Sequence, residues 1–164
     1  MLFRPPSLAL FAVAGLLLGS SGCGKQDDPQ PAQGSAHATG AGGHAHEPKY
    51  GGQLVELGDH EGSVELVLDR TAGRLTLYAL DAHAERFVRL PVASITIQAE
   101  AAGGPQTLLL TPVSNAATGE KAGDTSQFEA TAEWLKSAPA VTGRILELPV
   151  KSKTYRDVTF RLPQ

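Results

Sequence analysis

The fold is decided by residues 63–80, which read SVELVLDRTAGRLTLYAL. Successive side chains of a strand point to opposite faces, so apolar residues at every second position predict a strand with one buried face. Each half of this stretch follows that rule, with Val64, Leu66 and Leu68 in the first and Leu75, Leu77 and Ala79 in the second. The intervening residues 70–73 end in glycine and predict a turn. The stretch therefore predicts an antiparallel hairpin.

The same pattern continues through residues 50–164. Short apolar or alternating runs separated by turn residues predict further strands at 53–57, 87–90, 94–100, 106–111, 127–130, 143–150 and 155–162. At most one short helix is expected, near residues 131–137, and it is too brief to be stable alone. Strands at this spacing are typical of sandwiches and barrels. We predict an all-β domain, an antiparallel, immunoglobulin-like β-sandwich of about seven to nine short strands.

The first 23 residues, MLFRPPSLALFAVAGLLLGSSGC, contain the parts of an export signal. Arg4 precedes an apolar run that is shorter than the roughly 20 residues of a membrane-spanning helix. Small residues then lead directly to Cys23, the only cysteine. This segment resembles the signal peptide of bacterial lipoproteins, in which the cysteine is lipidated and becomes the mature N-terminus. The alternative is an ordinary secretory signal that leaves Cys23 as a free thiol.

The lipoprotein resemblance implies three properties. Residues 1–22 would be a signal peptide, Cys23 would carry lipid, and the exported protein would be held at a membrane by that lipid. In this family, an aspartate directly after the cysteine favours retention at the inner membrane. Gly24 stands there instead, so the resemblance favours the outer membrane or the periplasmic side.

Residues 24–49, directly after Cys23, contain no Val, Ile, Leu, Met or aromatic residue. Such a stretch cannot bury enough apolar surface to offset the entropy of ordering, so we predict a disordered tether over residues 23–49. His44 and His46 lie in it as an H-x-H pair, and residues two apart in an extended chain point the same way. Paired imidazoles bind Cu(II), Zn(II) or Ni(II). The alternative is a polar tail in which histidine is incidental.

A second histidine signal lies in the turn Gly-Asp-His-Glu, where His60 follows Asp59. The order of residues 44–80, from the H-x-H pair through Gly51 and Gly52 to this turn and an alternating strand, is similar to small exported bacterial β-domains. Some of those domains accompany heavy-metal efflux or copper-handling systems, and many have no assigned role. The resemblance implies His44, His46 and His60 as metal ligands. A plain polar turn is the alternative for His60.

Composition excludes several classes of protein. The formal net charge of −3 argues against a nucleic-acid binder, which needs a basic face. A single cysteine excludes an internal disulfide, and with Met1 as the only methionine the chain lacks the soft ligands of a Cu(I) carrier. None of the motifs GxSxG, HExxH, Walker A or GxGxxG occurs.

We therefore predict a non-enzymatic envelope lipoprotein. Its β-domain would be a binding or interaction module for another envelope protein, with a lipid as its contact to the membrane. The alternative is an accessory protein that binds a divalent transition metal through the tether histidines. An envelope hydrolase is a third reading, and it would require a cleft with a titratable group of perturbed pKa.

Overall fold

The computed structural model describes residues 46–101 and 103–162. The predicted signal peptide, Cys23 and His44 lie outside the described residues. The elements follow the order β1 (Gln53–Leu57), β2 (Gly62–Asp69), β3 (Arg74–Leu80), β4 (Ile95–Ala101), β5 (Gly104–Pro112), β6 (Gln127–Thr131), the 3₁₀ helix η1 (Glu133–Lys136), β7 (Val141–Val150) and β8 (Lys153–Leu162).

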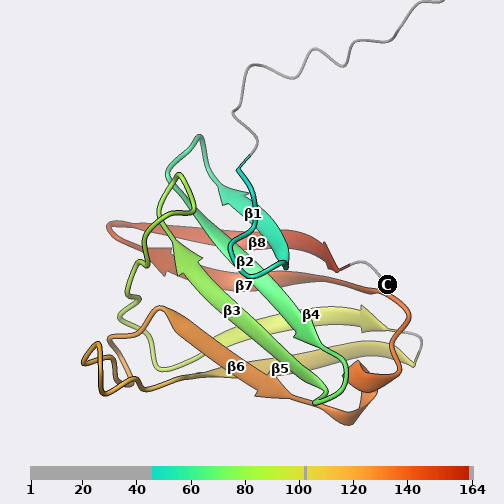
Figure 1. Ribbon diagram of the computed structural model, residues 1–164. Coiled ribbons are helices and arrows are strands. Elements are labelled where there is room, and N and C mark those ends of the chain that lie inside the picture. Colours follow the sequence, from blue (N-terminus) through green and yellow to red (C-terminus); the bar gives the residue numbers. More distant parts are fainter. Residues whose placement is uncertain (1–45, 102, 163–164) are drawn as a thin grey trace, which may run out of the picture. The chain divides into compact units, whose positions relative to one another are not determined.

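The prediction of an all-β, antiparallel domain is confirmed. Eight strands form one sheet in the order β1-β2-β3-β6-β5-β4-β7-β8, and the described neighbours all pair antiparallel (Figure 1). η1 is a single short turn whose Leu135 is fully buried. Within residues 46–101 and 103–162, no helix has the length and apolar character needed to cross a membrane. The run predicted at 87–90 forms only isolated bridges, Leu80 with Phe87 and Leu90 with Thr125.

The immunoglobulin-like sandwich is replaced by a nearly closed, barrel-like sheet. β6 pairs with both β3 and β5, and this links the two halves into one continuous sheet. The first and last strands then approach each other, and residues of β1 (53–55) and β8 (159–161) line one shallow pocket. No hydrogen-bonded ladder joins β1 to β8 in the described chain. Alternation in the sequence specifies which face of a strand is buried but not which strands are neighbours.

The core lies inside this curled sheet and follows the predicted period of two. Leu75, Leu77 and Ala79 of β3 are each at most 1% exposed. Their neighbours on the inner face are Val64, Leu66, Ile95, Ile97, Ala99, Leu110, Phe128, Ile145, Phe160 and Leu162. Burying each large aliphatic side chain stabilises the fold by about 1.5–3 kcal/mol. Three polar residues of β2 and β3 are also buried, Ser63, Glu65 and Thr76, and of these Glu65, on the opposite face, has no exposed surface.

Candidate metal centre

Residues 46–52, here called the docked segment, cover the outer face of β2. The carboxylate of Glu65 accepts hydrogen bonds from the backbone N–H groups of Lys49, Tyr50 and Gly52, each at 2.8 Å. A buried carboxylate is stable only with such partners. Glycine is required at position 52, since a Cβ there would lie 2.3 Å from a backbone oxygen of β2. The docked segment is therefore held to the barrel through its own backbone.

Side chains of the docked segment add a second attachment. The ring of Tyr50 stacks on Tyr78 of β3 with the ring centroids 4.1 Å apart. The Nζ of Lys49 donates a hydrogen bond to the backbone oxygen of Glu85 at 3.0 Å and lies 5.2 Å from the centre of the Phe87 ring. Lys49, which the sequence assigned to the tether, thus contacts the barrel.

The turn between β1 and β2 carries His60 in an unusual backbone conformation. Gly58 and His60 both have positive φ, at 61° and 56°. The carboxylate of Glu61 pairs with Lys153 and accepts a hydrogen bond of 2.6 Å from the Tyr155 hydroxyl. The hydrogen bond from Lys153, followed by that from Tyr155, lowers the pKa of Glu61, and the bond to Glu61 raises the pKa of Tyr155 to about 12. These contacts fasten the turn to β8 and hold His60 in place.

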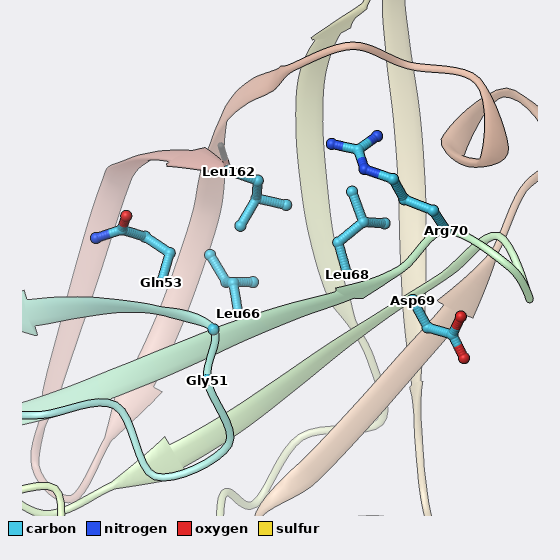
Figure 2. A pocket seen from close by; sticks show the side chains of 8 residues that line it. Gly51, Gln53, Leu66, Leu68, Asp69, Arg70 and Leu162 are labelled. Carbon is cyan, nitrogen blue, oxygen red and sulfur yellow. The ribbon is translucent and has the colours of Figure 1, made fainter. Parts of the chain in front are cut away.

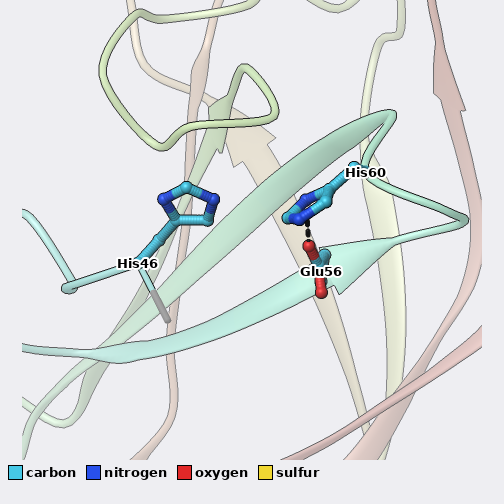
Figure 3. A group of neighbouring side chains, drawn as sticks. All are labelled: His46, Glu56 and His60. Carbon is cyan, nitrogen blue, oxygen red and sulfur yellow. Dashed lines mark ion pairs between the residues drawn. The ribbon is translucent and has the colours of Figure 1, made fainter. Parts of the chain in front are cut away.

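His46, Glu56 and His60 meet on the outer face of the β1–β2 hairpin (Figure 3). One ligand atom from each residue lies within 4.8 Å of the other two. The Nδ1 of His60 contacts the Oε1 of Glu56, and the rings of His46 and His60 are edge-to-face with centroids 5.4 Å apart. Glu56 and His60 are exposed and His46 is half-buried. The cluster is therefore open to an ion arriving from solvent.

One atom of the cluster has no partner. The Nε2 of His46 is shielded from solvent and makes no hydrogen bond to any described residue. Leaving a buried polar atom unpaired costs about 1–3 kcal/mol, and the great majority of such atoms in proteins have a partner. A ligand held at this nitrogen would satisfy it.

A third histidine lies beside the first. The ring of His83, in the loop between β3 and β4, is 5.4 Å from the ring of His46 and edge-to-face with it. His46 is thus flanked by His60 and His83 at equal centroid distances. Three separate parts of the chain supply the three imidazoles.

The sequence predicted His46 and His60 as ligands, although they stand on either side of the first strand, whose five residues span ~17 Å. The structure brings them together because bends at residues 49–52 fold the docked segment back along β1. Two further members, Glu56 and His83, were not predicted. The predicted hairpin at residues 63–80 could have indicated that His83 lies near His60. An antiparallel pair places the end of its second strand beside the start of its first.

The donor set suits a first-row transition ion. Imidazole and carboxylate ligands bind Zn(II), Cu(II) and Ni(II), while Mg²⁺ and Ca²⁺ prefer oxygen alone. Zinc–ligand bonds of about 2.0–2.2 Å place tetrahedral ligands ~3.3 Å apart. Ligand atoms that already lie within 4.8 Å of one another would need only small side-chain rotations to reach that spacing.

Other cavities in the described chain contain no comparable cluster. A pocket of about 420 Å³ lies between β2 and the end of β8, where Leu66, Leu68 and Leu162 gather beneath the guanidinium of Arg70 (Figure 2). That guanidinium donates hydrogen bonds to the backbone oxygens of residues 138 and 139. A second pocket of about 320 Å³ adjoins His60 and is lined by the hairpin turn of β7 and β8.

No family model, curated protein or solved structure matches this chain. The histidine cluster is the feature of the described residues that indicates a function.

Proposed function

We propose that this protein is a metal-binding module that holds a divalent transition ion through His46, Glu56 and His60. The observation that carries the proposal is the meeting of His46, whose Nε2 is shielded and unpartnered, with a second imidazole and a carboxylate, one ligand atom of each lying within 4.8 Å of the others. Two imidazoles and one carboxylate are a recognised ligand set for such ions. The hydrogen bonds around Glu65 and Glu61 support the site, since both fix the backbone that carries its ligands.

Titration calorimetry with Zn(II), Ni(II) and Cu(II) on the detergent-solubilised full-length chain tests this function. His46→Ala and His60→Ala should each weaken binding by more than ~100-fold, because losing a ligand exceeds the ~10–100-fold cost of losing an outer partner. His37→Ala, which changes another histidine of the predicted tether, is the matched control and should bind as the unaltered chain does. His44→Ala tests the tether ligand predicted from sequence. Equal affinity in His46→Ala and the control would contradict the proposal and favour the interaction module.

We also propose that the module is exported and attached to a membrane by lipid on Cys23. The support is the order of a basic residue, an apolar run and small residues before the only cysteine. In cells, a labelled fatty acid should enter the chain and the protein should fractionate with membranes. Cys23→Ser should lose the label, and its folded barrel should retain the metal affinity. Fatty-acid labelling of Cys23→Ser would contradict the assignment.

A further inference from the structure

In the loop that carries His83, the backbone is held by hydrogen bonds and the histidine side chain is exposed. The carboxylate of Asp81 accepts hydrogen bonds from the backbone N–H groups of Glu85 at 2.9 Å and Arg86 at 3.3 Å. Ala84 is buried and donates its N–H to the Asp81 backbone oxygen at 3.1 Å. The side chain of His83 is exposed, and its ring contacts only that of His46 among the described aromatic groups. Because these hydrogen bonds hold the loop backbone, the imidazole of His83 moves by a change of its side-chain rotamer alone.

The sheet register places this loop beside the metal cluster. Ser63 at the start of β2 pairs with Leu80 at the end of β3. The β1–β2 turn with His60 and the β3–β4 loop with His83 therefore leave the same end of the barrel. The docked segment brings His46 between them, with ring centroids 5.4 Å from each. This juxtaposition follows from backbone pairing and not from a flexible surface contact.

We propose that His83 is a fourth ligand that closes the coordination of the ion held by His46, Glu56 and His60. The inference rests on the proposed metal-binding function. Rotation of the exposed imidazole toward His46 brings a third nitrogen to the ion, and the set becomes three imidazoles and one carboxylate. Four protein ligands in a tetrahedral arrangement are typical of closed zinc sites, whereas catalytic sites keep a position for water or substrate.

His83 thereby decides what the site does. With three protein ligands, the two-histidine, one-carboxylate set has open positions and resembles the arrangement used by non-haem Fe(II) enzymes. With His83 bound, the ion is surrounded by protein, and the site retains metal instead of activating a bound molecule. The ion also joins the docked segment, the β1–β2 hairpin and the β3–β4 loop, three parts of the chain that no covalent cross-link connects.

The test compares His83→Ala with Glu85→Ala in the full-length chain. Glu85 is exposed in the same loop and contacts Lys49 through its backbone oxygen alone, so its substitution controls for changes in the loop. Zn(II) affinity is measured by competition with a chromophoric chelator. Co(II) substitution reports geometry, because tetrahedral Co(II) absorbs visible light much more strongly than five- or six-coordinate Co(II).

The unaltered chain and Glu85→Ala should both give the intense tetrahedral Co(II) spectrum. His83→Ala should bind Zn(II) more than ~100-fold more weakly, as expected for a ligand and not for an outer partner, and give the weaker spectrum of an ion whose coordination is completed by water. His83→Asp supplies a carboxylate at the same position and should recover part of both signals. Thermal unfolding without metal should be the same for all four chains, since the side chain of His83 is exposed.

The outcomes separate the two proposals. Tight binding with an unchanged Co(II) spectrum in His83→Ala would overturn the role of His83 and leave a three-ligand metal site. An equal loss in Glu85→Ala would also overturn it, since the effect would then belong to the loop. No binding by the unaltered chain would overturn both proposals.

Discussion

Two polar clusters on this barrel differ in how completely their hydrogen bonds are satisfied. Around Glu120, one carboxylate oxygen accepts from both the N–H and the hydroxyl of Ser126, and the other accepts from the hydroxyl of Thr118. In the histidine cluster, the Nε2 of His46 is shielded and has no described partner. Satisfied polar networks stabilise a fold, while the unsatisfied nitrogen of His46 is the atom that the proposed metal ion could satisfy.

The pKa of Glu120 agrees with a structural role. Burial opposes its ionisation, but the hydrogen bonds from Ser126 and Thr118 outweigh burial, and the pKa lies below its ordinary value. The same loop is fastened by an ion pair of 2.9 Å between Arg89 and Asp124. The polar groups around Glu120 are therefore paired with one another, whereas the histidine cluster, which we propose binds metal, retains an unpartnered nitrogen.

The largest expected effect comes from Glu65→Ala, which should lower both the stability of the fold and the affinity for metal. Three backbone N–H groups would lose their acceptor. Each of these groups that stays buried without a partner costs about 1–3 kcal/mol, so we expect the free energy of unfolding to fall by ~2–4 kcal/mol. Metal affinity should fall as well, because the docked segment positions His46. Urea denaturation and calorimetry measure the two losses. Glu147→Ala, at an exposed ion pair with Arg156, is the control and should change stability by less than ~1 kcal/mol.

A smaller effect is expected from Glu120→Ala, and it should be confined to stability. Two polar groups of Ser126 would lose their acceptor, and the expected loss is ~1–3 kcal/mol in the free energy of unfolding. Metal affinity should match that of the unaltered chain. A drop in metal affinity without partial unfolding would contradict the prediction that the Glu120 cluster affects stability alone.

The smallest effect concerns the pH dependence of the β1–β2 turn. The folded pKa of Glu61 is lowered, so its contribution to stability is present above its ordinary pKa of 4.5 and is lost as pH falls through the lower folded value. The folded pKa of Tyr155 is raised to about 12, so its contribution is fully present below 10.0 and is lost as pH rises from 10.0 through about 12.

Tyr155→Phe should therefore remove the alkaline part of the stability profile and weaken the acid part, which the Lys153–Glu61 pair still maintains. The measurement is the urea midpoint between pH 3 and 6 and between pH 9 and 12. A profile identical to that of the unaltered chain would show that the hydrogen bond to Glu61 does not hold the turn. A parallel loss of metal affinity would show that fixing the turn also positions His60.

Much of the fold follows from local pattern, and the site follows from it only in part. Alternation at Leu75, Leu77 and Ala79 was sufficient to predict which face of β3 is buried. The requirement for glycine at position 52 could not be predicted from the sequence, because it depends on how closely the docked segment approaches β2. The alternating pattern of β2 predicts that Glu65 faces solvent. Glu65 is buried because residues 46–52 cover it.

The sequence by itself determined the antiparallel all-β class and the positions of most strands, and its H-x-H pair and the family resemblance supplied His46 and His60 as candidate ligands. These depend on the period of side chains along one strand and on residue chemistry, which are local properties. Only the tertiary structure decided the strand order, the near closure of the barrel and the meeting of His46 with Glu56, His60 and His83. These depend on which distant segments pack together, and alternation carries no information about that choice because every alternating strand presents the same kind of apolar face.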